Sequence, residues 1–288
     1  MLFLDTCPKP GRPFTVDGAF RIPTSLVGNT DGSNAGNTWK MNDVPSVREN
    51  SSLSQVIAME FSDQGEGEHA SVASFARHTL QLLSMGAPGS LLMGSQKAAL
   101  DEIKHAKMCY GIAETFLGDV IQPSTLDIDG SVRAQSKEEV IQSVINEGCI
   151  GETISAVRAQ VGSQYAKQPM IKDMLETIAA DETNHAQLAW NTVQWAIERF
   201  PELRDVAEET FRARLDHPME TLNSFPTGDF YDCDQDSTLH DHGLLLDEDH
   251  IKTENLSIKN VIGPVVENEF QNVGAISTQI LNIDFSKY

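Results

Sequence analysis

Two segments of the chain, 80 residues apart, repeat one pattern of metal-binding side chains. Residues 101–106 read Asp-Glu-Ile-Lys-His-Ala, and residues 181–186 read Asp-Glu-Thr-Asn-His-Ala. Each segment contains Glu-x-x-His, and positions i and i+3 of a helix share one face, so a carboxylate and an imidazole can point to one place. Carboxylates and imidazoles without a thiolate cluster suit iron or manganese. Glu102, His105, Glu182 and His185 are therefore candidate metal ligands.

Both pairs fall on the apolar stripe of an amphipathic helix. Ionisable groups on such a stripe are costly to bury unless they are paired or bind a metal. One Glu-x-x-His is common on solvated helix faces, whereas two copies on apolar stripes indicate ligands. The apolar neighbours are Ala98, Cys109, Ile112 and Phe116 in the first helix, and Ile171, Leu175, Ile178, Ala189 and Val193 in the second.

Each pair has a glutamate at the mirror position of its helical hairpin. Residues equally far from a hairpin loop lie at the same height on antiparallel helices. A loop centred near residue 86 places Glu68 opposite the first pair, and a loop near residues 167–168 places Glu152 opposite the second. A site of this type takes one such glutamate from each of the two other helices. Glu68 and Glu152 therefore complete a predicted set of six ligands.

The segment around Glu147 and Glu152 predicts an irregular helix. Gly148 and Gly151 both lie inside this helix, which costs stability unless packing requires them. In a regular helix two residues five apart point about 140° away from each other. A π-bulge, which often marks a functional site, brings Glu147 and Glu152 onto one face. We favour Glu152 as the ligand and Glu147 as an extra, catalytic carboxylate or a partner of a ligand. A capping or solvated role for Glu147 stays open.

The order of elements predicts an all-α fold. Helix-start and helix-stop signals, among them a capping box at Ser136 and Glu139, predict two hairpins of long helices with one long crossover between them. This is the connectivity of a ferritin-like antiparallel four-helix bundle. The predicted helices span residues 52–85, 88–118, 136–167 and 169–199, and the turn-rich crossover spans residues 119–135.

Three parts are expected along the chain. Residues 1–50, rich in Pro, Gly, Asn and Ser, form an irregular N-terminal arm, residues 51–200 form the bundle, and residues 201–288 form a partly helical extension that packs on it. Within the extension we expect a helix over 202–220, a loop over 224–250 and partial helix over 251–272. No strand is predicted.

Composition excludes several classes of protein. The net charge of −21 repels phosphate backbones, so neither nucleic acid nor an anionic membrane is an expected partner, whereas cations are favoured. The four cysteines (Cys7, Cys109, Cys149 and Cys233) contain no CxxC pair, which excludes a zinc ribbon. The sequence contains no run of about 18 apolar residues. We expect a cytoplasmic protein.

The motifs resemble those of the ferritin-like superfamily, which includes rubrerythrins, bacterioferritins and di-iron oxidases and hydroxylases. Residues 68–77, 101–106 and 147–153 are most similar to a group of bacterial ferritin-like domain proteins, as are residues 11–14 and 16–18. The resemblance implies the bundle and the di-metal site and supplies no substrate. The chain lacks a rubredoxin-type cysteine quartet, and its arm and extension would obstruct a ferritin cage.

The expected function is that of a non-haem di-iron oxidoreductase. Such an enzyme would activate dioxygen or peroxide and oxidise a small molecule, with an external electron donor and two iron ions as cofactor. Manganese or a mixed manganese–iron pair stays open, as does a homodimer. The alternative is a ferroxidase or metal-binding protein without an organic substrate. A transfer-RNA hydroxylase is a third interpretation, which the net charge of −21 disfavours.

Three residues next to the ligands have two interpretations each. Asp101 and Asp181 precede the ligand glutamates, so each either orients a ligand imidazole or faces solvent. Cys109 lies one turn beyond His105 and either lines the metal cavity or fills the core.

Overall fold

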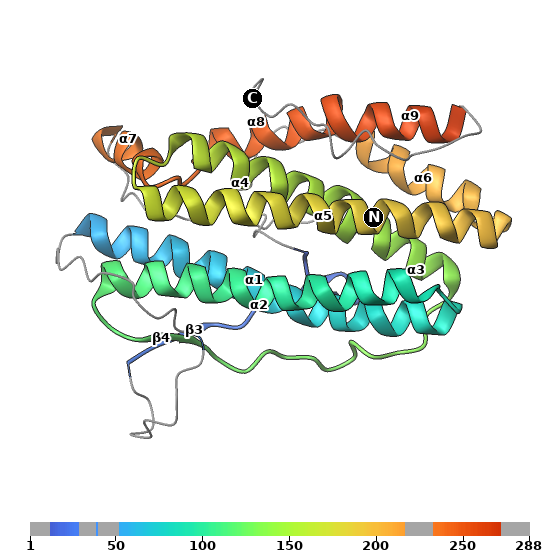
Figure 1. Cartoon of the computed structure of the whole chain (residues 1–288), viewed down its shortest axis with the longest axis horizontal. Coiled ribbons are helices and arrows are strands. Elements are labelled where there is room, and N and C mark those ends of the chain that lie inside the picture. The colour runs from blue at the N-terminus through green and yellow to red at the C-terminus, as the bar shows by residue number, and fades with distance from the viewer. Residues whose placement is uncertain (1–11, 29–38, 40–51, 217–232, 272–288) are drawn as a thin grey trace. The chain divides into compact units, whose positions relative to one another are not determined.

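The structure is a computed structural model, and it describes residues 12–28, 39, 52–216 and 233–271 (Figure 1). The described chain is mostly helical, which confirms the expected all-α class. Of the arm expected over residues 1–50, only residues 12–28 and 39 fall within the described part. Among the described helices, none combines the length and the apolar character that a membrane crossing requires.

The chain divides into two compact units. The first contains the described residues 78–95, 134–216 and 233–271, and the second contains 12–28, 39, 52–77 and 96–133. Helices α1 (Ser52–Met85) and α2 (Gly89–Leu117) each contribute to both units. Between these helices Gly86 has φ of 72°, a left-handed conformation that glycine adopts without steric cost.

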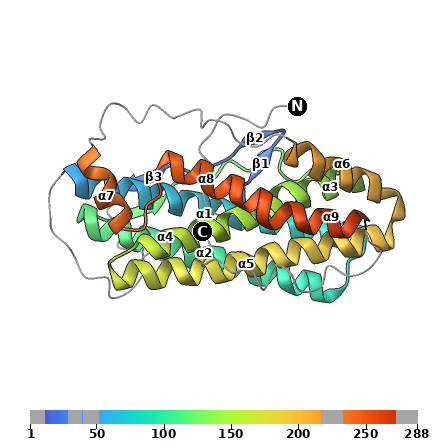
Figure 2. The ribbon, with the colours of Figure 1, turned by 90° about the horizontal axis from the view of Figure 1, so that it is seen from above.

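The first unit is built around α4 and α5, which pack along each other. Trp190 of α5 stacks on Phe211 of α6 with ring centroids 4.9 Å apart, at the centre of an apolar core. Helix α8 lies along α4 (Figure 2). The elements of this unit are α3 (Lys137–Ser143), the π-helix η1 (Val144–Glu152), α4 (Thr153–Tyr165), α5 (Pro169–Arg199), η2 (Pro201–Leu203), α6 (Arg204–Leu215), α7 (Cys233–Asp241), α8 (Asp247–Ser257), the π-helix η3 (Ile258–Ile262) and α9 (Gly263–Gln271).

Local signals explain where the α3–η1–α4 rod begins and why it changes pitch. The predicted capping box is present, because the Ser136 side chain accepts from the backbone N–H of Glu139 while the Glu139 side chain accepts from the backbone N–H of Ser136. The predicted π-bulge is confirmed as η1, which contains both helical glycines, Gly148 and Gly151. Glycine weakens the regular helix and tolerates the wider turn.

The C-terminal part contains more helix than the sequence predicted. The loop expected over residues 224–250 is wrong for residues 233–241 and 247–250, which belong to α7 and α8. Helix α7 is anchored by contacts distant in sequence, since Lys167 Nζ donates to Asp241 Oδ2 at 2.9 Å and the backbone N–H of Lys167 donates to the Asp241 carbonyl. Such tertiary contacts override a weak local preference.

Four short strands in the second unit correct the prediction of none. Strands β1 (Thr15–Val16) and β2 (Ala19–Phe20) form a hairpin, and β3 (Ser25–Val27) pairs antiparallel with β4 (Ile121–Pro123). Strands of two or three residues are too short to show the alternation of apolar and polar residues that identifies a strand. The β3–β4 ladder ties the N-terminal segment to the crossover that follows α2.

Candidate metal centre

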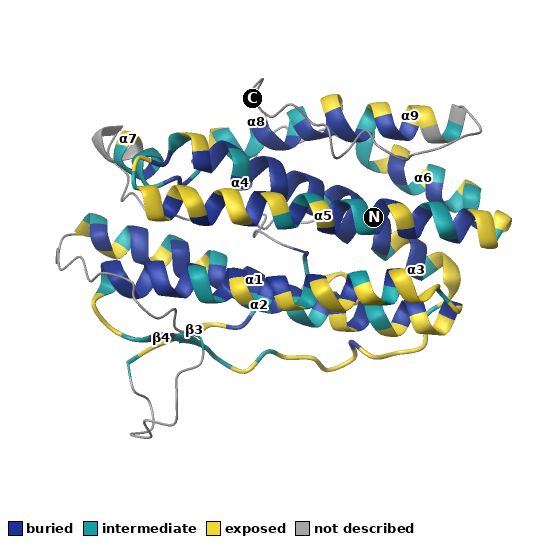
Figure 3. Cartoon of the chain, viewed as in Figure 1, coloured by how far each residue is buried: buried dark blue, intermediate teal, exposed yellow. Residues whose placement is uncertain are grey.

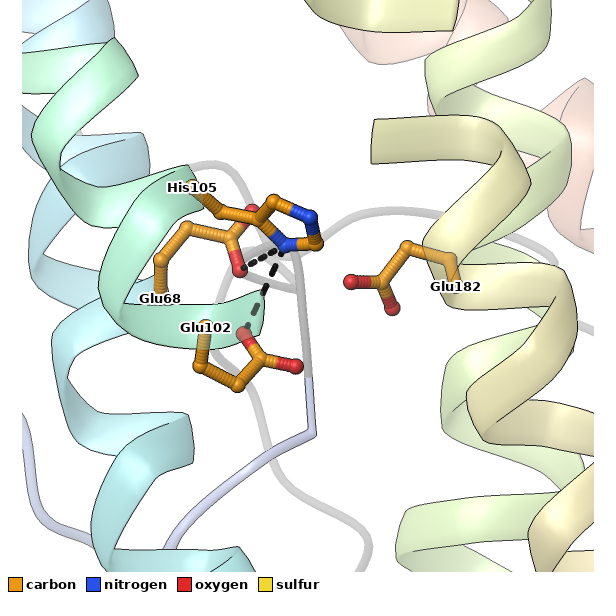
Figure 4. Close-up of side chains that lie close together, drawn as sticks. All are labelled: Glu68, Glu102, His105 and Glu182. Atoms are coloured by element: carbon orange, nitrogen blue, oxygen red, sulfur yellow. Dashed lines mark ion pairs between the residues drawn. The ribbon is translucent and has the colours of Figure 1, made fainter. Parts of the chain in front are cut away.

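The second unit brings together one triad of ligand-type side chains. Glu68 comes from α1, and Glu102 and His105 come from adjacent turns of α2 (Figure 4). His105 Nδ1 lies 3.7 Å from Glu68 Oε2 and 3.8 Å from Glu102 Oε2. One ligand atom of each residue lies within 4.8 Å of the others, and all three residues have 0% exposure. We call these three residues the Glu68 triad.

The first unit contains a triad of the same composition. Glu152 ends the π-helix η1, and Glu182 and His185 lie one turn apart on α5. His185 Nδ1 is 3.6 Å from Glu182 Oε1, and ligand atoms of all three residues lie within 4.8 Å of one another. The exposures are 0% for both carboxylates and 3% for His185. We call these three residues the Glu152 triad.

The π-helix decides which glutamate joins the second triad. Among the described residues, the cluster of ligand atoms around Glu182 contains Glu152 and does not contain Glu147. Glu147 is nevertheless buried, and it lies one wide turn before Glu152. A π-turn completes its rotation in slightly less than five residues, so both carboxylates face the same side of the rod. Glu147 thus lies outside the triad's cluster of ligand atoms, on the same side of the rod as Glu152.

Residues around the Glu68 triad clarify two of the predictions. Cys109 is fully buried, and the pKa of its thiol is raised well above its ordinary value, first by burial and then by the negative charge of Glu68. The thiol is therefore neutral and lies near the triad. The solvent-facing interpretation is wrong for Asp101, which is 1% exposed and forms ion pairs with Lys97 at 2.9 Å and Lys104 at 2.5 Å. Asp181 is half-buried.

Sequence analysis missed a group of aromatic residues formed by Trp39, His69 and Tyr110. Trp39 contacts His69 edge-on with ring centroids 4.9 Å apart, and it lies 6.4 Å from the ring of Tyr110. A Cβ on Gly65 would come within 2.9 Å of the Tyr110 ring, so glycine at this position makes room for the tyrosine. Burial raises the pKa of the Tyr110 phenol, which stays protonated. The one sequence signal was Gly65, an isolated glycine inside a long helix.

The donor sets fit divalent first-row metals. Each triad offers two carboxylates and one imidazole, the mixture that suits iron and manganese and that lacks the thiolates favoured by zinc or copper(I). Two buried carboxylates within 4.8 Å of each other repel, and a cation between them removes this repulsion. Each triad could therefore hold one metal ion.

Comparisons with family models, curated proteins and solved structures find no match to this chain. The two triads and their surroundings are therefore the evidence that bears on function.

Proposed function

We propose that the two triads together bind a pair of iron ions, and that the chain is a non-haem di-iron oxidoreductase on a ferritin-like four-helix bundle. The observation that carries the proposal is that one buried donor set, two glutamates and one histidine, occurs twice. Each set takes one glutamate from α1 or η1 and a Glu-x-x-His pair from α2 or α5. Two such halves provide the six ligands of a di-iron carboxylate site.

The first turns of α2 pack against α5 within the first unit. A Cβ on Gly94 of α2 would lie 2.6 Å from Leu188 Cδ1 of α5, so the two helices touch at this point. In the proposal each triad would hold one of the two iron ions through its two carboxylates and its imidazole.

The protein residues would have distinct roles in the proposed reaction. The four triad carboxylates balance the positive charge of the ions, and the two imidazoles fix their positions. Apolar neighbours such as Ile112 and Ile178 exclude water from the site. We assign to Glu147 the role of holding or moving a proton at its carboxylate. Bound iron would supply the electrons and open coordination positions that activation of dioxygen or peroxide requires, and an external donor would restore the electrons.

The burial of the ligands favours a small-molecule oxidase over the ferroxidase alternative. A ferroxidase must pass hydrated iron ions through its site. All six ligands here are at most 3% exposed, whereas dioxygen and small apolar molecules enter buried sites more readily than hydrated ions do.

The proposal is tested by metal analysis of the purified full chain. We expect two iron ions per chain and a Mössbauer spectrum of coupled iron, with both signals reduced in Glu102→Gln and Glu182→Gln. Glu114→Gln is the matched control, because Glu114 is a buried carboxylate of α2 outside the triads that accepts from the backbone N–H of Ile121 at 3.0 Å. Unchanged iron content in Glu102→Gln and Glu182→Gln would refute the ligand assignment.

A further inference from the structure

One stretch of this acidic chain contains no acidic residue. The chain has 42 Asp and Glu among 288 residues, so a stretch of 32 residues would carry about four or five at the average density. Residues 69–100 carry none. This stretch covers the second half of α1, the turn at Gly86 and the first half of α2. The helical hairpin is therefore a surface with little of the negative charge found elsewhere.

The hairpin also exposes large apolar side chains. Leu80 and Leu83 lie one turn apart on α1 with exposures of 48% and 56%, and Met93 of α2 is 70% exposed. Thr79 Oγ1 and Ser95 Oγ form a hydrogen bond of 2.9 Å across the hairpin, which places Leu80 at the height of Met93. Figure 3 shows exposed positions along both helices of the hairpin. We call Leu80, Leu83 and Met93 the hairpin patch.

The inward side of the same hairpin is already packed. Leu82 is fully buried, and Met85 belongs to the apolar core of the first unit. Gly94 touches Leu188 of α5. The hairpin patch therefore lies on the side of the two helices that the core leaves uncovered. Apolar patches of this kind are typical of interaction sites.

The surface that continues the patch along α2 is close to neutral. Leu100 follows Met93 by seven residues on the same face of α2 and is 60% exposed. Lys97 and Lys104, on the same side, both form ion pairs with the buried carboxylate of Asp101. Two positive charges thus share one negative charge, so the face carries a small positive charge in a chain of net charge −21.

We propose that the hairpin patch is the interface between two copies of this chain. Two molecules of charge −21 repel each other, and this repulsion is weakest where acidic residues are missing from the facing surfaces. A two-fold interface brings the same surface of each copy together, so a nearly neutral apolar face can pair with itself. A foreign basic partner would be attracted to the acidic surfaces instead. The dimer goes beyond the proposed iron chemistry and does not depend on it.

The proposal predicts an unusual dependence on salt. Apolar contact drives the association, while long-range repulsion between the acidic chains opposes it. Salt screens this repulsion, because the Debye length falls from about 30 Å at 0.01 M to about 10 Å at 0.1 M. Dimer formation should therefore strengthen as salt rises, whereas an interface held by ion pairs would weaken.

Analytical ultracentrifugation of the full chain tests the interface. We expect a dimer that becomes a monomer in both Leu83→Glu and Met93→Glu, with helix content unchanged by circular dichroism. Met59→Glu is the matched control, because Met59 is 67% exposed on α1 but lies about 36 Å from Leu83 along the helix. This control should remain a dimer. The milder variant Leu83→Ser should weaken the dimer, which keeps the test valid if a glutamate variant misfolds.

Three results would overturn the proposal. The first is a wild-type chain that stays monomeric at every protein and salt concentration. The second is a dimer that survives both glutamate substitutions with the fold intact. The third is a monomeric full chain that dimerises once residues 272–288 are removed, because the chain's own end would then be the occupant of the patch.

Discussion

Replacing a triad glutamate with methionine should change stability in opposite directions with and without metal. Glu102 shares one imidazole with Glu68, so the Glu68 triad buries two carboxylates beside a single imidazole. Glu254, also buried, lies between two guanidinium groups: Arg158 at 2.9 Å and Arg214. Methionine has nearly the length of glutamate without its charge. The pair Glu102→Met and Glu254→Met therefore compares two buried carboxylates that differ in charge balance.

The magnitudes follow from how each charge is balanced. In metal-free protein, replacing Glu102 by an apolar side chain removes the cost of burying a polar group beside a second carboxylate, which is about 1–3 kcal/mol. Replacing Glu254 leaves the guanidinium of Arg158, whose side chain is 9% exposed, without its carboxylate, and should cost about 3–5 kcal/mol. A metal ion present at about 100 times its dissociation constant raises the free energy of unfolding by about 2.7 kcal/mol per site. The free energy of unfolding of wild type should rise by this amount in iron, and that of Glu102→Met should rise by much less.

Denaturant unfolding followed by circular dichroism measures both effects. Each protein is unfolded once with a chelator and once with ferrous iron under anaerobic conditions. With the chelator, we expect Glu102→Met to be more stable than wild type. With ferrous iron, we expect it to be less stable than wild type. Glu254→Met should be less stable than wild type by a similar amount in both conditions.

Either of two results would refute the reasoning. If Glu102→Met destabilises the metal-free chain as strongly as Glu254→Met does, Glu102 serves the fold itself, and its burial is no sign of a metal site. Equal responses of wild type and Glu102→Met to iron would lead to the same conclusion.

Three further predictions concern the fold around the site. Gly162→Ala should lower the free energy of unfolding in urea by about 1–3 kcal/mol, because the new Cβ would lie 2.6 Å from the carbonyl oxygen of Gly243. The control Gly89→Ala, whose Cβ would meet no atom within 4 Å, should be neutral or stabilising. Burial, then Arg158, lowers the pKa of His250 to about 3, below its ordinary 6.5. Since the unfolded chain takes up this proton first, stability present above pH 6.5 is lost as the pH falls towards 3. From pH 7 to pH 5 this histidine contributes a loss of about 2 kcal/mol, which His250→Gln should abolish in unfolding measured at both pH values. Ser136→Ala removes the cap of α3 and should lower the free energy of unfolding by about 1 kcal/mol, whereas a loss below 0.3 kcal/mol would contradict the role of the cap.

The members of each triad could be predicted because helices are regular. Spacing i, i+3 fixes the angle between Glu102 and His105, and equal distance from a hairpin loop fixes the height of Glu68. The structure places all three together, as it does Glu152, Glu182 and His185. The π-helix was also predictable, because Gly148 and Gly151 signal that regular helix is weak at that point.

Contacts between distant segments could not be predicted in the same way. Strand β3 pairs with β4 almost 100 residues later, and strands this short carry no periodicity of their own. The ion pairs of Glu254 with Arg158 and Arg214 join α8 to α4 and α6, and nothing local in the sequence matches these partners. Helix α7 escaped prediction for the same reason, since its last residue, Asp241, is held by Lys167 at the α4–α5 turn.

The location of the irregular helix is consistent with the role proposed for the Glu152 triad. Regular α-helix would be more stable than η1, which buries two glycines and two carboxylates within nine residues. The fold compensates nearby, with a full capping box at Ser136 and tight packing of η1 against α5 and α6. Selection for stability alone would replace the two glycines. The capping box and the packing of η1 only offset their cost. What the π-turn provides is a second carboxylate, Glu147, on the same face as Glu152, which is the placement that the proton-holding role proposed for Glu147 requires.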